Sequence, residues 1–232
     1  MPTRNSGASY DAVDWRHITR SDGHAALFAV ARPAVVLTEF ASGRRRLTAA
    51  ELDRARRMRS TDHRDAFVAA HVLVRAAAAR MLGMHLDDLW IEQACRHCGL
   101  SGHGRPELRS RAPLDTTCEI TFSHTTRHVM AAAATTRIGV DLEDRSSRVP
   151  LDLLALTPEE QASLADVAEP NDVALRWWTR KEAMVKLGII EINDFGSVDA
   201  RPDVVSFDAG PAAELLSIES EDWVASVALP AQ

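Results

Sequence analysis

Two acidic residues, Asp141 and Glu143, stand in the segment Ile138-Gly-Val-Asp-Leu-Glu143, whose alternation of apolar and acidic residues predicts a strand. Side chains two positions apart on a strand share a face about 7 Å apart, so the two carboxylates point the same way. Hard oxygen ligands at this spacing suit Mg²⁺, which keeps several waters and often bridges substrate phosphates. Gly139 would let a ligand backbone come close. Taken alone, however, such a pair is better interpreted as a solvated strand face.

A second segment, Trp177 to Lys186, reads W-W-T-R-K-E-A-M-V-K and falls in a predicted helix. Glu182 and Lys186 are four positions apart and therefore lie on one helix face. An exposed ion pair worth ~0.3 kcal/mol would explain that spacing by itself. The composition argues otherwise, because 25 of the 27 basic residues are Arg and the only two lysines, Lys181 and Lys186, fall in this helix. Lysine offers a compact ammonium that can titrate, so its use here indicates chemistry.

Together the two segments resemble the paired signatures of 4'-phosphopantetheinyl transferases, G-[IV]-D-[IVL]-E followed by W-[STC]-x-K-E-[AS]-x-x-K. Gly139–Glu143 and Trp178–Lys186 match both signatures in order and spacing. Upstream, Phe122-Ser-His-Thr125 is similar to the family's S-H motif, and Gly104-Arg-Pro106 to its G-K-P loop with Arg in place of Lys. The resemblance extends from about Arg44 to Gly188. Length and a two-half organisation resemble the surfactin-synthetase (Sfp) type rather than the short, trimeric holo-acyl-carrier-protein-synthase type.

The resemblance implies an enzyme that transfers the 4'-phosphopantetheine of coenzyme A to a serine of an apo acyl or peptidyl carrier protein and releases 3',5'-ADP. Asp141, Glu143 and Glu182 would hold Mg²⁺, with Mn²⁺ as a substitute, against the pyrophosphate for in-line attack on the β-phosphorus. Lys186 would bind coenzyme A near the leaving α-phosphate oxygen. Either Glu182 or a water on the metal would accept the serine proton, and the sequence leaves both open.

The resemblance also implies contacts to the rest of coenzyme A. Ser123 and His124 would contact its phosphates, although His124 taken alone would be interpreted as an ordinary, partly buried histidine. Arg105 would replace the family's nucleotide-binding lysine, and His103 would lie beside the adenine. Arg54 would touch the 3'-phosphate, which a guanidinium can grip with two hydrogen bonds, or it belongs to a solvated basic face.

One cysteine motif supports a competing interpretation. Cys95-Arg-His-Cys98 followed by His103 begins a zinc knuckle, but the fourth ligand would fall at Leu108, and Cys118 lies at an unusual distance. A reduced pair in a turn fits the same residues. A zinc-binding nucleic-acid or protein-interaction module is therefore one alternative function, and a catalytically silent binder of coenzyme A or carrier proteins is another.

The bulk composition is that of an ordinary globular protein: 232 residues, 46% apolar and 26% charged. No run approaches eighteen apolar residues, the N-terminus lacks an apolar signal core, and three cysteines cannot form a disulfide framework. We therefore expect a protein of the cytoplasm with no membrane partner. The resemblance to the surfactin-synthetase type implies a monomer that binds no nucleic acid. Residues 1–134 carry a net charge of +5 and residues 135–232 carry -11, which suits a polyanionic ligand held by one part and a cation held by the other.

The elements that must position these residues follow from turn and cap signals. Capping boxes at Thr48–Glu51 and Thr157–Glu160 open helices, and Gly83 and Gly188 end two long helices over 62–81 and 171–187, the second capped by Asn171. In the helix over 62–81, Phe67 stands where the family has a small hydroxylated residue, so no phosphate hydrogen bond is assigned there. Strands are predicted over 35–40, 90–94, 119–122, 129–134, 137–143, 204–207, 215–218 and 223–228, with a Gly/Pro/Cys loop between the second and third.

These elements predict an α+β fold of two similar, pseudo-duplicated halves. Each half has a long helix packed on a small, mostly antiparallel sheet, and the active site lies between the halves. Residues 1–24 are expected to be flexible, 25–134 to form the half that contacts the nucleotide, and 135–232 to form the half with the metal and catalytic motifs.

Overall fold

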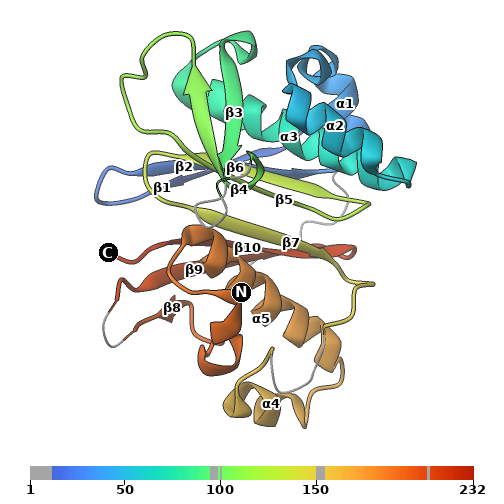
Figure 1. Cartoon of the computed structure of the whole chain (residues 1–232). Helices are drawn as coiled ribbons and strands as arrows, with labels where there is room; N and C mark the ends of the chain where they lie inside the picture. Colours follow the sequence, from blue (N-terminus) through green and yellow to red (C-terminus); the bar gives the residue numbers. More distant parts are fainter. Residues whose placement is uncertain (1–11, 95–98, 100, 150–154, 208–209) are drawn as a thin grey trace.

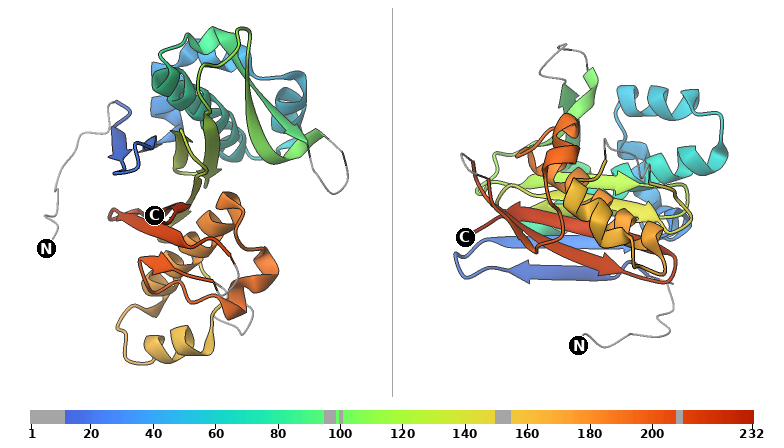
Figure 2. Two further views of the ribbon diagram at one scale, coloured as in Figure 1. Left: turned by 90° about the vertical axis from the view of Figure 1, so that its left-hand side faces the viewer. Right: turned by 90° about the horizontal axis from the view of Figure 1, so that it is seen from below.

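The computed structural model describes residues 12–94, 99, 101–149, 155–207 and 210–232. In these ranges two four-stranded antiparallel sheets lie face to face, and each is covered on its outer face by one long helix (Figure 1). Seen from the side, the first half of the chain (blue to green) lies above the second half (orange to red) (Figure 2). The fold is therefore α+β, as predicted.

The first sheet has the strand order β1-β2-β6-β5 and packs on helix α3 (Thr61–Leu82). Its strands are β1 (Trp15–Thr19), β2 (Ala25–Ala31), β6 (Val129–Ala134) and β5 (Glu119–His124). Strand β6 is buried on both faces, with Ala131 and Ala133 toward α3 and Met130 and Ala132 toward the second sheet. The three alanines have small side chains, which lets the layers approach closely.

The second sheet has the order β7-β10-β9-β8 and packs on helix α5 (Pro170–Leu187). Its strands are β7 (Gly139–Asp144), β10 (Trp223–Pro230), β9 (Ala213–Glu219) and β8 (Val204–Val205). A Cβ atom at Gly139 would lie 1.9 Å from the carbonyl oxygen of Ala183 in α5. Gly139 therefore admits the backbone of this helix, not that of a ligand, which corrects the sequence interpretation.

Shorter elements connect the layers. They are α1 (Pro33–Glu39), the 3₁₀ helices η1 (Ala41–Arg46), η2 (Leu86–Asp88) and η3 (Ile192–Ser197), α2 (Ala49–Arg57), the hairpin of β3 (Leu89–Ala94) and β4 (Ser101–Ser110), and α4 (Pro158–Leu164). None of the helices in the described ranges is both long and apolar enough to cross a membrane.

Both predicted capping boxes form, at the start of α2 and of α4. In each box the glutamate also binds a buried cation on the long helix that follows: Glu51 Oε2 lies 2.7 Å from Arg75, and Glu160 Oε2 lies 2.6 Å from Lys181. The two halves thus use the same device to fasten a short helix to a long one, which agrees with the predicted similarity of the halves.

Two expectations for the N-terminal region are wrong. The segment over 35–40 is not a strand but most of α1, because Pro33 occupies the first helical turn and Val36 is buried in the core that α3 shares. Residues 1–24 are also not uniformly flexible, since β1 (Trp15–Thr19) pairs with β2 along its whole length.

Two further expectations are wrong. The predicted loop before residue 119 contains β4, which pairs with β3 from Leu89 to Ala94. Asn171 does not cap α5, because the helix begins at Pro170; its side chain instead donates to the carbonyl oxygen of Ser147 at 3.0 Å. The helices ended by Gly83 and Gly188 are confirmed, and both glycines have a positive φ.

Candidate functional site

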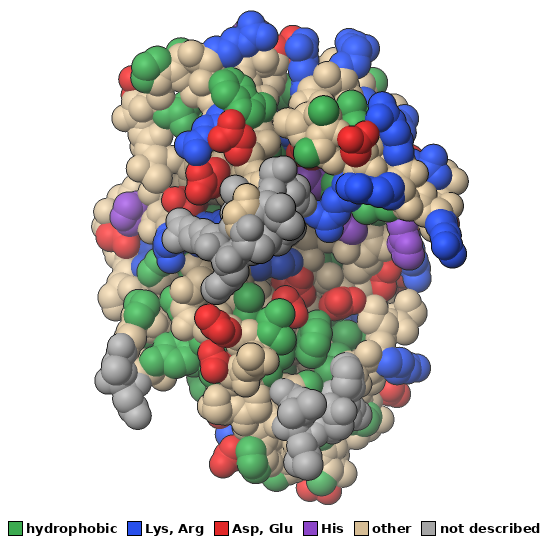
Figure 3. Space-filling model, in the orientation of Figure 1, with side chains coloured by type: hydrophobic (Ala, Val, Ile, Leu, Met, Phe, Trp, Pro, Cys, Tyr) green, Lys and Arg blue, Asp and Glu red, His purple; other side chains and the backbone are tan. Residues whose placement is uncertain are grey.

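The edge strands β5 and β7 bring the motif residues of the two halves together. Each lies at the end of its sheet within the described residues. Across this boundary the Ser123 hydroxyl donates a hydrogen bond to Asp141 Oδ1 at 2.7 Å. Basic side chains gather over α1–α3, and acidic side chains lie in the band where the halves meet (Figure 3). The charge asymmetry of the sequence therefore coincides with this boundary.

Asp141 is the centre of the site. Its Oδ1 accepts hydrogen bonds from Ser123 and from the ammonium of Lys186, each at 2.7 Å. Its Oδ2 is buried and has no hydrogen-bond partner among the described residues. A carboxylate oxygen left in this state is costly unless something positive binds it.

Two further carboxylates share this environment. Burial raises the pKa of Glu143, the charges of Asp141 and Asp144 raise it further, and a 2.9 Å hydrogen bond from Ser147 opposes them. Burial also raises the pKa of Glu182, and the charge of Asp141 adds to that effect. Asp141 therefore repels both glutamates, and a divalent cation would relieve this repulsion and bind the unsatisfied Oδ2.

These carboxylates fit a cation in their chemistry, but they do not form a ready-made coordination group. Among the described residues, no three His, Cys, Asp or Glu side chains are arranged so that they could hold a metal ion. The ammonium of Lys186 lies on Asp141 instead. The metal assignment of Asp141, Glu143 and Glu182 therefore stays a prediction.

His124 lies in a cationic neighbourhood at the end of β5. Burial lowers the pKa of His124 to about 4, and the nearby groups His71, Lys186 and Arg54 lower it in the same direction. The imidazole is therefore neutral at physiological pH and has one N–H to donate. Arg54, from α2, and Lys186, from α5, are close enough to act on it, so the structure brings together three residues that the sequence assigned to the donor nucleotide.

The other end of the site is formed by Arg105 and the C-terminus of α5. Arg105 is paired with Glu119 at 2.7 Å and donates to the carbonyl oxygen of Leu187 at 3.4 Å. A Cβ atom at Gly188 would lie 3.3 Å from the guanidinium of Arg137 and 3.5 Å from that of Arg105. Two guanidinium groups therefore lie beside the end of α5.

The two lysines of α5 have different surroundings. Lys181 is completely buried, and its ammonium donates to Glu160 at 2.6 Å and to the carbonyl oxygens of Ala155 and Phe195 at 3.0 and 2.7 Å. Its three N–H groups are matched by three acceptors, which a larger guanidinium with five donors would not match. Lys181 therefore stabilises the second half, and only Lys186 reaches the site.

The predicted zinc motif is only partly visible. Cys95 and Cys98 lie outside the described residues, as does the side chain of His103, whose backbone belongs to β4. Burial raises the pKa of Cys118 to about 12, with a smaller contribution from the charge of Glu119. The zinc motif therefore stays a prediction, with Cys118 as its possible fourth ligand.

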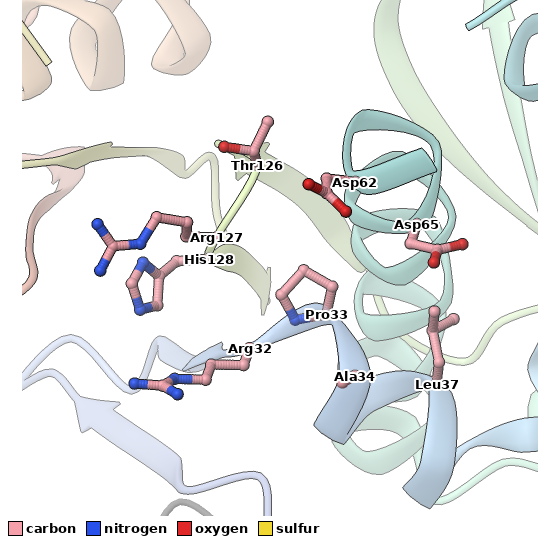
Figure 4. A pocket seen from close by; sticks show the side chains of 9 residues that line it. All are labelled: Arg32, Pro33, Ala34, Leu37, Asp62, Asp65, Thr126, Arg127 and His128. Atoms are coloured by element: carbon pink, nitrogen blue, oxygen red, sulfur yellow. The ribbon is translucent and has the colours of Figure 1, made fainter. Parts of the chain in front are cut away.

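Two cavities flank the turn between β5 and β6. The first, of about 290 Å³, adjoins His124 and is lined by Met58, His63, His124, Thr125 and Thr126. The second, of about 340 Å³, shares Thr126 with the first. Arg32, Arg127 and His128 line one side of it and Asp62 and Asp65 of α3 line the other, and both guanidinium groups point away from α3 (Figure 4). His128 is held by Asp144 of β7 at 2.6 Å, so this turn is fixed to the second half.

A model of the 4'-phosphopantetheinyl transferase superfamily matches residues 137–227. The match covers β7 and α5 and therefore both signature segments, and it supports membership of that superfamily, whose activity is phosphopantetheine transfer from coenzyme A to carrier proteins. No curated protein matches the chain.

Proposed function

We propose that this chain is a 4'-phosphopantetheinyl transferase of the surfactin-synthetase type, which modifies a serine of apo acyl or peptidyl carrier proteins with coenzyme A as donor. The observation that carries the proposal is Asp141. One of its oxygens is held by Ser123 and Lys186 from separate elements, and the other is buried and unsatisfied next to two carboxylates of raised pKa. Such a group suits a cation that bridges to a diphosphate.

Asp141, Glu143 and Glu182 would hold Mg²⁺, or Mn²⁺ as a substitute. When bound, the ion would neutralise charge on the pyrophosphate of coenzyme A. Carboxylate ligands are preferred by these hard cations, and the repulsion among the three would fall on binding.

The protein's own groups then account for the transfer. The serine oxygen of the carrier forms a bond to the β-phosphorus, its proton passes to Glu182, and the bond from that phosphorus to the bridging oxygen breaks. Glu182 would take the proton because it is a carboxylate next to Asp141, on the helix that also carries Lys186. Lys186, whose side chain is 28% exposed, would stabilise the negative charge on the departing 3',5'-ADP.

The nucleotide would lie along β5, between α2 and the β4 hairpin. Ser123 would contact the phosphates, and the neutral His124 would donate a hydrogen bond to them. Arg105 would bind the nucleotide, and His103 would lie beside the adenine. Arg54 would bind the 3'-phosphate. The cationic surroundings of His124 support this placement, because coenzyme A carries three phosphates.

We further propose that the enzyme acts as a monomer in the cytoplasm, with carrier proteins of fatty-acid, polyketide or nonribosomal peptide synthesis as partners. A panel of purified apo carrier proteins, incubated with coenzyme A and Mg²⁺, tests the function by mass spectrometry. We expect at least one carrier to gain the mass of phosphopantetheine. The proposal fails if no carrier gains this mass while a transferase of known activity modifies the same panel.

The same assay separates the alternatives. A zinc module predicts stoichiometric zinc that is lost when Cys95 and Cys98 are changed to Ser, whereas the transferase keeps Mg²⁺-dependent turnover in that variant. A silent binder predicts binding of coenzyme A without any modified carrier.

A further inference from the structure

Arg54 and His124 both pack against one aromatic ring, that of Phe67. The guanidinium carbon of Arg54 lies 5.2 Å from the centroid of the Phe67 ring. The His124 ring approaches Phe67 edge to face, with 6.2 Å between centroids and an angle of 88°. Phe67 belongs to α3 and is 1% exposed. A cation from α2 and an imidazole from β5 are thus placed relative to each other by a ring that cannot move freely.

Behind Phe67 the packing continues to a buried ion cluster. His71 lies 4.2 Å from Phe67 and 4.7 Å from Phe122 between ring centroids. Its Nδ1 is 2.6 Å from Glu51 Oε1, and Arg75 donates to both oxygens of Glu51 at 2.8 and 2.7 Å. Glu51, His71 and Arg75 are at most 7% exposed.

Glu51 therefore connects α2 to α3 by two routes. It belongs to α2, one helical turn before Arg54, so its bonds to Arg75 fix the helix that carries Arg54. Through His71 it also supports Phe67, the ring on which Arg54 and His124 rest. The core does not need this ion cluster for its stability, because apolar residues of the same volume often stabilise a core as well as a buried ion pair does. The ion cluster instead determines where α2 lies.

We propose that Glu51 is a positioning residue that, through α2, His71 and Phe67, holds Arg54 and His124 to receive the 3'-phosphate monoester of the donor nucleotide. The inference rests on the proposed function, which supplies the donor. A phosphate monoester is the fitting ligand because it offers several acceptor oxygens to a fork of donors, and a guanidinium beside an imidazole N–H provides such a fork.

The second half provides a matched control. Glu160 closes a capping box and binds a buried cation, Lys181, as Glu51 does with Arg75, but it fastens α4 to α5 in the second half rather than α2 to α3. Glu51→Gln and Glu160→Gln each keep a side chain that can cap a helix and leave one buried cation without its counter-charge. Both variants are expected to lose stability, and only the first should lose recognition of the 3'-phosphate.

The experiment measures dissociation constants for coenzyme A and for dephospho-coenzyme A by calorimetry on the full chain. We expect the wild type to prefer coenzyme A over dephospho-coenzyme A. Glu51→Gln should reduce this preference about tenfold, which corresponds to the loss of roughly one charge-assisted hydrogen bond. Glu160→Gln should keep the wild-type preference. Phe67→Leu, which removes the ring but stays apolar, should behave like Glu51→Gln and serves if that variant does not fold.

Three results would overturn the inference: a wild type without preference for coenzyme A, a Glu51→Gln or Phe67→Leu variant with the wild-type preference, or an equal loss in Glu160→Gln. Carrier modification by the wild type is read separately. If the wild type modifies the carrier but the variants keep its preference for coenzyme A, only the positioning role is refuted. If the wild type does not modify the carrier, the proposed function is refuted.

Discussion

Asp141→Asn is the substitution that tests the site most directly. It keeps the shape of the side chain and removes the charge shared by Ser123, Lys186 and the proposed cation. Transfer should fall by at least about a hundredfold in kcat/KM, the usual effect of removing one electrostatic contact to a transition state. Part of that loss should be recovered at high Mg²⁺ concentration, because a weakened site is filled by mass action.

The same change should cost little stability, because two contributions oppose each other. The new amide would weaken two hydrogen bonds to a charged group, each worth about 1.5–3 kcal/mol when lost outright, although its carbonyl oxygen remains an acceptor for both donors. In return the substitution removes the negative charge that raises the pKa of Glu143 and Glu182, and with it their repulsion. We expect the free energy of unfolding to change by no more than about 1 kcal/mol.

Asp144→Asn is the matched control. Asp144 is a buried carboxylate on the same strand, but it faces the first sheet and binds His128 at 2.6 Å. This variant should lose stability in urea unfolding and keep its kcat/KM per folded molecule. Full activity of Asp141→Asn at ordinary Mg²⁺, or an equal loss of activity in Asp144→Asn, would refute the assignment of Asp141.

Three other changes probe the same structure. Lys186→Arg keeps the charge but replaces a compact ammonium, so carrier modification should slow by about tenfold; wild-type kinetics would show that the ammonium is not required. Burial raises the pKa of Glu51, but the hydrogen bond from His71 and the charge of Arg75 outweigh it and lower it from 4.5 to about 2. Its contribution to stability, roughly 3 kcal/mol, is therefore present above pH 4.5 and lost as the pH falls toward 2. In urea unfolding, the difference in free energy of unfolding between the wild type and Glu51→Gln should shrink over that range. A difference that stays constant with pH contradicts the lowered pKa. Gly139→Ala should destabilise the protein by about 3 kcal/mol or more, since its Cβ would overlap α5, whereas Gly83→Ala, with no atom within 4 Å of the new Cβ, should cost about 1 kcal/mol in the same thermal unfolding assay.

The sequence predicted best the features that depend on near neighbours. Both capping boxes form because the threonine and the glutamate that complete each one are three residues apart. The alternation around Asp141 predicted β7 because a strand repeats every two residues. Gly83 and Gly188 end their helices because only the residue itself must adopt a positive φ.

The features that the sequence did not predict depend on distant residues. The β-branched run after Pro33 favours a strand locally, but contact with α3 makes it a helix. Lys181 and Lys186 share one helix, and only Glu160, far back in the chain, distinguishes the buried lysine from the one at the site. The convergence of Ser123 and Lys186 on one oxygen of Asp141 likewise requires three elements to be placed first.

The position of the site follows from the packing of the two sheets. Their facing surfaces are filled by apolar side chains such as Met130, Val140 and Leu142, which leaves no room for a polar ligand between them. Within the described residues, β5 and β7 are edge strands, and they meet through the side chains of Ser123 and Asp141 rather than as one continuous ladder. Ser123 and Asp141 therefore lie at the edge of the packed layers, supported by the rigid sheets behind them. The proposed donor and cation would therefore bind at this edge rather than between the facing sheets.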